Sequence, residues 1–298
     1  MKVLVTGTSG QLGFDVMKEL ARRGHEGIGA DRSDTEEKFE HVILDITDAE
    51  KVMDVVRDLK PEAIIHCAAW TNVDGAEEPE NLEKVRAVNV DGTANLAEAS
   101  KAVDAKFVYI STDYVFNGEG DQPWKPDDKN YAPINVYGQS KLDGEKEVVR
   151  ILDKYFIVRI AWVFGKNGKN FVRTMIEVGK KHSVVKVVDD QIGTPTYTYD
   201  LARLLVDMIE TDKYGYYHAT NEGGYISWAD FTEEIFRQVG IDSKVERVTT
   251  EEYEKIAGKT VAKRPFNSRL DKAKLVEAGF TPLPEWQDAL GRYLKGSA

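Results

Sequence analysis

The stretch Val3-Leu4-Val5-Thr6-Gly7-Thr8-Ser9-Gly10-Gln11-Leu12-Gly13 decides the fold of this 298-residue chain. An apolar strand is expected at its start, and Leu12, Val16 and Leu20 then recur at helical spacing. A glycine-rich turn between strand and helix lets backbone amides approach a pyrophosphate at the helix N-terminus. The spacing Gly-x-x-Gly-x-x-Gly departs from the principal dinucleotide fingerprint, so the flanking strand and helix carry much of the weight. We therefore predict a cofactor loop that includes Gly7, Gly10, Gln11, Leu12 and Gly13.

Apolar runs typical of strands recur along the first half of the chain, and helical patterns separate them. Strands are expected near residues 28–30, 42–44, 63–67, 107–110 and 156–160. Helices are expected near residues 52–59, 82–100 and 136–152. Strands separated by helices indicate right-handed crossovers and a parallel sheet. The predicted fold class is therefore α/β, a Rossmann-type doubly wound parallel sheet with a smaller C-terminal α/β substrate lobe.

The alternation of strands and helices loosens beyond about residue 165. Strands are still expected at 184–188 and 216–219, Ser227 is expected to cap a helix, and residues 249–252 fit a capping box. No linker rich in Gly, Ser or Pro interrupts the chain. We expect residues 1–165 to form the NAD(P)-binding domain with the catalytic groups. Residues 166–298 would form mainly a substrate-binding lobe interleaved with it, and the polar segment 117–132 is a candidate lid.

Composition disfavours several classes of partner. The formal net charge of −11 argues against a nucleic acid and against an anionic membrane surface. The single cysteine, Cys67, excludes an internal disulfide and favours a reducing cytoplasm. The apolar start is too short for a signal peptide, and no apolar run approaches the roughly 20 residues of a membrane span. The five histidines lack metal-ligand spacing, so no metal site is predicted.

The end of the second expected strand carries the residues that would meet the adenosine half of a cofactor. Asp31 is placed to accept a hydrogen bond from a ribose hydroxyl, which favours NADH. Arg32 lies next to it and suits a 2′-phosphate, which favours NADPH. Asp45 and Ile46 follow the third strand and are expected to flank the adenine. The sequence leaves the choice between NADPH and NADH open.

Tyr137 and Lys141 stand four residues apart near the start of an expected helix, so they share one helix face. A phenol ionises near pH 10, and a neighbouring ammonium is expected to lower that pKa. Thr112, at the end of the preceding strand, is placed to bind a carbonyl oxygen. Together the three groups are a candidate set for adding a proton to a carbonyl oxygen while a hydride reaches its carbon.

Longer strings around these residues carry a resemblance to a known family. The most specific are Ser111-Thr112-Asp113-Tyr114-Val115-Phe116 and Asp190-Gln191-Ile192-Gly193-Thr194-Pro195-Thr196, whereas the Tyr137/Lys141 pair is shared more widely. On these strings the chain resembles the extended short-chain dehydrogenase/reductases, and within them the dTDP-4-dehydrorhamnose reductases, over nearly its whole length.

The resemblance implies NADPH- or NADH-dependent reduction of the 4-keto group of dTDP-4-dehydro-L-rhamnose to dTDP-L-rhamnose. It makes Tyr137 the proton donor, Lys141 its partner and Thr112 the group that tunes it. The dTDP-sugar substrate would meet Thr112, Asp113, Trp162 and Asn170, although Asn170 could equally be a helix cap. Ala68 and Ala69 would border the nicotinamide half of the cofactor.

Two rival functions stay open at this stage. A regulatory subunit of methionine adenosyltransferase shares the fold and much of the motif set, but the intact Thr112, Tyr137 and Lys141 favour an enzyme. A related nucleotide-sugar reductase or epimerase would use the same Tyr and Lys on another sugar. Ile160-Ala161 and Trp70 depart from the residues expected in the family. The oligomeric state, a homodimer included, is not fixed by the sequence.

Overall fold

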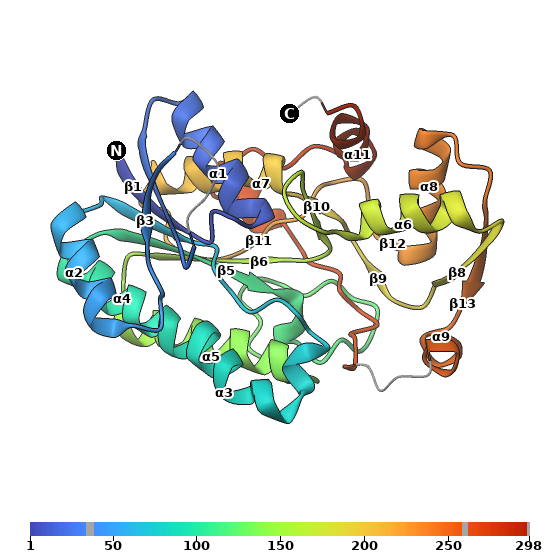
Figure 1. The fold of residues 1–298 in the computed structure, drawn as a ribbon, viewed down its shortest axis with the longest axis horizontal. Coiled ribbons are helices and arrows are strands. Elements are labelled where there is room, and N and C mark those ends of the chain that lie inside the picture. Colours follow the sequence, from blue (N-terminus) through green and yellow to red (C-terminus); the bar gives the residue numbers. More distant parts are fainter. Residues whose placement is uncertain (34–38, 258–261, 297–298) are drawn as a thin grey trace.

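A seven-stranded parallel sheet forms the centre of the protein (Figure 1). The computed structural model describes residues 1–33, 39–257 and 262–296. The strand order is β11-β6-β5-β4-β1-β2-β3, and every neighbouring pair is parallel. The strands are β1 (Lys2–Thr6), β2 (Glu26–Asp31), β3 (Glu40–Ile43), β4 (Ala63–His66), β5 (Lys106–Thr112), β6 (Tyr155–Ile160) and β11 (Gly215–His218). The predicted doubly wound parallel sheet is confirmed.

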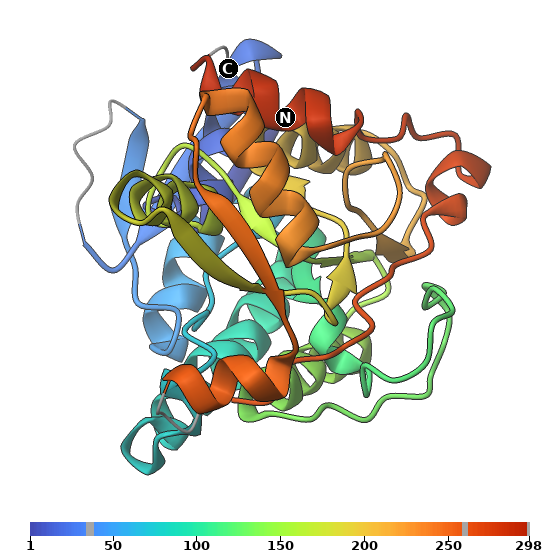
Figure 2. The same cartoon turned by 90° about the vertical axis from the view of Figure 1, so that its right-hand side faces the viewer.

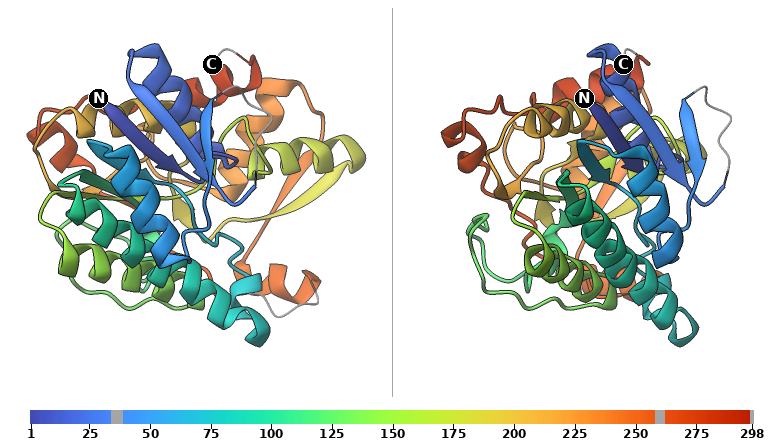
Figure 3. Two further views of the ribbon diagram at one scale, coloured as in Figure 1. Left: turned by 60° about the vertical axis from the view of Figure 1, so that its left-hand side comes forward. Right: turned by 90° about the vertical axis from the view of Figure 1, so that its left-hand side faces the viewer.

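Helices cover both faces of this sheet (Figure 3). One face carries α1 (Gln11–Arg22) and α7 (Thr198–Ile209), and the other carries α2 (Ala49–Leu59), α4 (Gly92–Ala102) and α5 (Val136–Ile151). Successive strand residues point to opposite faces, so Val3 and Val5 pack on the first layer and Leu4 on the second. Burial on both faces explains why the strands read as continuous apolar runs.

The helix expected at 82–100 is interrupted. It forms as α3 (Leu82–Arg86), a π-helical turn (η3, Ala87–Asp91) and α4. The π turn carries the buried Asn89, whose side chain accepts from Trp70 N at 2.7 Å and donates to Ser140 Oγ at 2.9 Å. A π turn contains one residue more than an α-helical turn. This places Asn89 in contact with residues beside the cavity described below.

The second lobe is built from short strands and helices and has its own apolar cluster (Figure 2). Its strand pairs are β7 (Val163–Phe164) with β10 (Thr196–Tyr197), β9 (Ile192–Gly193) with β12 (Ile226–Ser227), and β8 (Val184–Val188) with β13 (Lys244–Val248). Its helices are α6 (Phe171–Lys181), α8 (Trp228–Val239), α9 (Thr250–Ala257) and α11 (Trp286–Leu294). The chain crosses between the lobes, because α7, β11 and α10 (Ala273–Glu277) lie beyond residue 165 yet pack with the large sheet.

The local caps expected from the sequence are present. Ser227 and Asp230 form a reciprocal capping box at the start of α8. Thr249 and Glu252 exchange the same pair of hydrogen bonds at the start of α9. The remaining short elements are 3-10 turns, η1 (Gly75–Glu77), η2 (Pro79–Asn81) and η4 (Asp113–Val115).

The segment 117–132 is packed against the second lobe. Its Trp124 stacks on Phe116, with ring centres 4.6 Å apart. Trp124 N donates to Arg269 O, and Asn267 Nδ2 donates to Gln122 O. These contacts fix the segment to residues 267–269, and none of residues 117–132 lines the cavity described below.

Candidate active site

A cavity of about 990 Å³ opens at the carboxyl ends of β1, β2, β4, β5 and β6. That edge is where open parallel sheets bind their ligands. Its lining includes all but one of the predicted site residues: Gly7, Gly10, Gln11, Leu12, Gly13, Asp31, Arg32, Asp45, Ile46, Ala68, Ala69, Thr112, Asp113, Tyr137, Lys141 and Trp162. The structure therefore brings the predicted cofactor and catalytic groups into one continuous space.

The turn between β1 and α1 requires its glycines. Gly7 has a φ of +72°, and a Cβ there would lie 2.6 Å from Ala68 N. A Cβ on Gly13 would collide with the Gly7 carbonyl oxygen. Gly10 caps α1 without a side-chain hydrogen bond, so the first amides of the helix have no partner inside it. This narrow turn with free amide donors fits the pyrophosphate of a dinucleotide.

Two carboxylates accept backbone hydrogen bonds at the end of the cavity where the adenosine half of a cofactor is predicted to lie. Asp31 Oδ2 accepts from Ser9 N at 3.0 Å, and Oδ1 accepts from Arg32 N at 2.8 Å. Asp45 accepts from the backbone N and the hydroxyl of Thr47, and the backbone hydrogen bond is the main reason its pKa is lowered. The Arg32 side chain is exposed beside them. β2 ends at Asp31, as expected.

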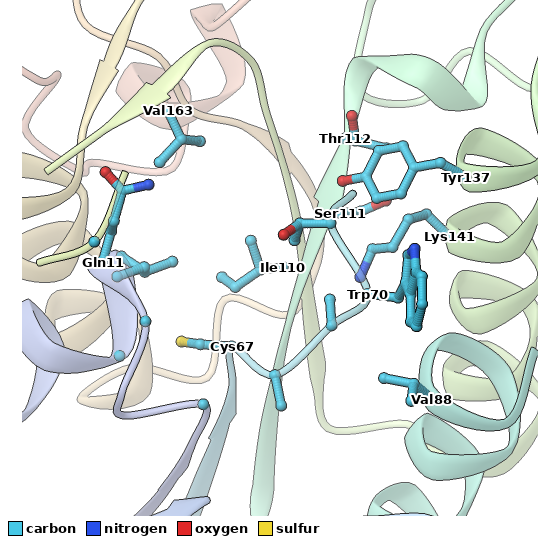
Figure 4. Close-up of a pocket in the computed structure, with 18 of the residues that line it drawn as sticks. Gln11, Cys67, Trp70, Val88, Ile110, Ser111, Thr112, Tyr137, Lys141 and Val163 are labelled. Carbon is cyan, nitrogen blue, oxygen red and sulfur yellow. The ribbon is translucent and has the colours of Figure 1, made fainter. Parts of the chain in front are cut away.

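Helix α5 begins at the cavity because Asn135 caps it. Asn135 Oδ1 accepts from Gly138 N at 2.7 Å, and Gly138 lets the helix approach the Tyr114 carbonyl closely. Tyr137 thus lies in the first turn and Lys141 one turn later. Figure 4 shows both side chains beside Ser111 and Thr112 on one wall, with Gln11 on the opposite wall. The helix start therefore sets the position of both candidate catalytic groups.

Burial controls the charge state of this wall. Lys141 is 3% exposed, and its burial lowers the pKa of its ammonium to about 7. The pKa of Tyr137 is raised above its ordinary value, first by burial and then by Asp113. The expected lowering of this pKa by Lys141 is thus wrong, because burial has the largest effect on the phenol and the Asp113 carboxylate adds to it. The phenol remains protonated, which is the form a proton donor needs.

Two predicted substrate groups lie at the far end of the wall. Asp113 is buried, and its burial raises the pKa of the carboxyl to about 6. Its Oδ1 accepts from Thr112 Oγ1 at 3.1 Å. Trp162 has a left-handed backbone, with φ +51°, and stacks on Trp228 with ring centres 3.7 Å apart. Gly193 permits this packing, since a Cβ there would lie 2.9 Å from the Trp162 ring.

Asn170 is the predicted site residue that lies outside the cavity lining. It caps α6 by accepting from Arg173 N at 3.0 Å, and its Nδ2 donates to Gly165 O at 2.8 Å. Its amide also contacts Gln11 Oε1 at 3.2 Å. The sequence left open whether Asn170 caps a helix or binds the substrate, and these contacts are those of a helix cap.

Several lining residues were not anticipated. Trp228 follows a helix cap and resembles a core aromatic in sequence, yet it faces the cavity. Asn167 donates to Ser9 O at 3.0 Å and so brings the second lobe against the glycine turn. No pattern of residues in the sequence predicts this contact between Asn167 and Ser9. Ser111 and Trp70 also line the cavity; the sequence had marked Ser111 as part of a family string and Trp70 as a departure from the family, without assigning either to the site.

Known proteins match this chain along its full length. The model of the RmlD substrate binding domain family matches residues 1–298. The chain belongs to this family. A dTDP-4-dehydrorhamnose reductase of Streptomyces griseus is 41% identical over 96% of this chain and 91% of that protein. The family assignment agrees with the resemblance inferred from the sequence.

Solved structures of family members share the architecture. A dTDP-4-dehydrorhamnose reductase of Clostridium acetobutylicum superposes with a TM-score of 0.91 at 42% identity, covering 100% of this chain and 99% of that one. The enzyme of Bacillus anthracis, solved in complex with NADP, gives 0.89 at 40% identity, covering 100% and 99%. Within residues 1–33, 39–257 and 262–296, no helix is long and apolar enough to cross a bilayer, and no cluster of three or more His, Cys, Asp or Glu could hold a metal.

Proposed function

We propose that this protein reduces the 4-keto group of dTDP-4-dehydro-L-rhamnose to dTDP-L-rhamnose with NADPH or NADH. The observation that carries the proposal is one continuous cavity, which joins the glycine turn to Thr112, Tyr137 and Lys141. Relatives with 35–41% identity over nearly the whole chain are named dTDP-4-dehydrorhamnose reductases, and this supports the choice of substrate.

The cofactor would lie along the cavity from the Asp31 end to the wall formed by Ser111, Thr112, Tyr137 and Lys141, here called the catalytic wall (Figure 4). The glycine turn would hold its pyrophosphate, Asp31 or Arg32 its adenosine ribose, and Asp45 and Ile46 its adenine. Ala68 and Ala69 would border the nicotinamide half. When bound, NAD(P)H supplies the hydride that adds to C4 of the sugar.

The chain's own groups would move the proton. Thr112 would turn its hydroxyl hydrogen from Asp113 to the 4-keto oxygen and polarise the carbonyl. Tyr137 gives its phenolic proton to that oxygen, so the C=O becomes a C–OH as hydride reaches the carbon. The Lys141 ammonium stabilises the resulting phenolate and binds cofactor ribose hydroxyls. Asp113 and Trp162 would contact the sugar nucleotide.

Oxidation of NADPH and NADH, followed at their absorbance with purified protein, tests this function. The substrates are dTDP-4-dehydro-L-rhamnose and other 4-keto sugar nucleotides that differ in base or sugar. We expect turnover with the first, and its loss in Tyr137→Phe. Tyr155→Phe is the matched control, because Tyr155 starts β6 at the opposite end from the cavity. Preference for another sugar would indicate a related reductase, and cofactor binding without any turnover would indicate a binding protein.

A further inference from the structure

A fully buried ion pair lies behind the catalytic wall. Arg159 on β6 donates through Nε to Glu145 Oε1 at 2.8 Å and through Nη2 to Oε2 at 2.7 Å. The side chains are 0% and 1% exposed. Burying two charges is costly even when they pair, so such a pair is weak evidence for a role in stability. The contacts that Arg159 and Glu145 make with other residues say more about the role of the pair.

The first of these contacts reaches the cavity wall. Ser111 Oγ donates to Glu145 Oε1 at 2.5 Å. Ser111 lines the cavity and immediately precedes Thr112 in β5. The Glu145 carboxylate therefore fixes the strand end that presents the candidate carbonyl-binding hydroxyl.

The second contact is electrostatic and concerns Lys141. Glu145 lies one turn further along α5, on the same helix face. Burial lowers the pKa of Lys141, and the Glu145 carboxylate opposes this effect. The ammonium of Lys141 is therefore sensitive to this one carboxylate.

The other titratable groups that face Lys141 are neutral near pH 7. They are His66 of β4, Cys67 next to it, Tyr109 of β5 and Tyr137 of α5. Burial lowers the pKa of His66 to about 3 and raises that of Cys67 to about 12. Burial also raises the pKa of both tyrosines. Among these groups Glu145 supplies the negative charge.

Arg159 holds the Glu145 carboxylate in one orientation. Its Nη1 donates to Pro126 O at 3.1 Å, and its Nη2 donates to Tyr131 OH at 3.0 Å. Its guanidinium also lies 5.0 Å from the centre of the Phe116 ring. The ion pair is thus anchored in the 117–132 segment on one side and touches the catalytic wall on the other.

We propose that Glu145 is a positioning residue for the reaction: fixed by Arg159, its carboxylate holds Ser111, and through it Thr112, while its negative charge, one helical turn away on the same face of α5, favours the ammonium of Lys141. The kinetic part of this proposal rests on the proposed function. The electrostatic part does not, since it concerns the protein without substrate.

The test compares three variants in two readouts, with a fourth variant to assign an NMR signal and thermal unfolding to check the fold. Glu145→Gln removes the charge, and Glu145→Gln/Arg159→Met removes the whole pair, so that no unpaired buried charge is left to unfold the protein. Glu147→Gln is the matched control, because it breaks a surface pair with Arg150 on the same helix. The Lys141 pKa is measured by NMR on protein with ¹³Cε-labelled lysine, with Lys141→Met identifying the resonance. The pH profile of kcat is the second readout, and thermal unfolding reports the fold.

We expect the Lys141 pKa to fall by about one unit in Glu145→Gln and in the double variant. The alkaline limb of kcat should move to lower pH with it, because the ammonium is then lost sooner. Displacement of Thr112 should lower kcat by up to about 10²-fold. Glu147→Gln should match the wild type in both readouts.

A folded double variant with the wild-type Lys141 pKa and pH profile would overturn the proposal and leave the pair a structural element. If Glu145→Gln does not fold, the double variant supplies the same comparison. If the wild type does not turn over the sugar nucleotide, the proposed function fails while the NMR titration still decides the charge effect.

Discussion

The Lys141 ammonium lies 4.0 Å from the centre of the Tyr109 ring, and the Tyr109 hydroxyl donates to the Lys141 carbonyl oxygen at 3.2 Å. One aromatic residue of β5 therefore holds both the charged end and the backbone of the lysine. Tyr109 is itself fully buried. The lysine is thus oriented before any ligand binds, which reduces what binding must reorganise.

Tyr137→Phe should abolish most turnover and leave NADPH binding nearly intact. The ring still packs against Tyr114, but the proton is gone. Loss of one positioned proton donor costs about 10²–10⁴-fold in rate. Steady-state kinetics and NADPH fluorescence titration measure the two effects. A variant with more than half of the wild-type kcat would exclude Tyr137 as the donor.

Lys141→Met should weaken NADPH binding and slow turnover together, because one ammonium serves the ribose and the phenol. The pKa of Lys141 is lowered to about 7, so its charge is present below that pH and is lost as pH rises through it. NADPH affinity of the wild type should therefore decline between about pH 6 and 8 and stay level in the variant. Lys146→Met, an exposed position on the same helix, is the control. Equal pH dependence in all three proteins would contradict the role.

The residues Asp31 and Arg32 should set the cofactor preference in opposite directions. Asp31→Ala removes a carboxylate that repels a 2′-phosphate, so the kcat/KM ratio should shift toward NADPH. Arg32→Ala removes a phosphate partner, so the ratio should shift toward NADH. The measurement is kcat/KM with both cofactors in the three proteins. An unchanged ratio in Asp31→Ala would show that this carboxylate does not reach the ribose.

Asp113→Asn should stabilise the protein while reducing activity. Burial raises the folded-state pKa of this carboxyl from 3.8 to about 6, so ionising it destabilises the fold. The unfolded chain then binds fewer protons between these values, and stability falls with rising pH across that window. The gain from Asn should be full above about pH 6 and absent below about pH 4. Thermal unfolding of both proteins at pH 4 and pH 8 checks this, and a gain of equal size at both would refute the assignment.

The elements that could be predicted from the sequence are those that depend on residues close together along the chain. The β1–turn–α1 unit, the Tyr137/Lys141 spacing and the Ser227 cap all depend on neighbours within about one or two helical turns. Parallel order then followed from the alternation of strands and helices, which places Thr112 and the glycine turn at the same edge of the sheet.

The features that could not be predicted from the sequence depend on contacts between segments that lie far apart along the chain. The π turn serves Asn89, whose partners Trp70 and Ser140 lie 19 and 51 residues away. The raised pKa of Tyr137 follows from burial by the whole fold. Trp228 lines the cavity and stacks there on Trp162, across 66 positions of the chain.

The most direct measurement uses NADPH with both hydrogens at C4 of its nicotinamide replaced by deuterium, with dTDP-4-dehydro-L-rhamnose as substrate. The proposed function predicts one deuterium at C4 of the sugar, in a product identified by NMR as dTDP-L-rhamnose, and no labelled product from Tyr137→Phe. An unlabelled or epimerised sugar, or NADPH that is bound but never oxidised, would contradict it.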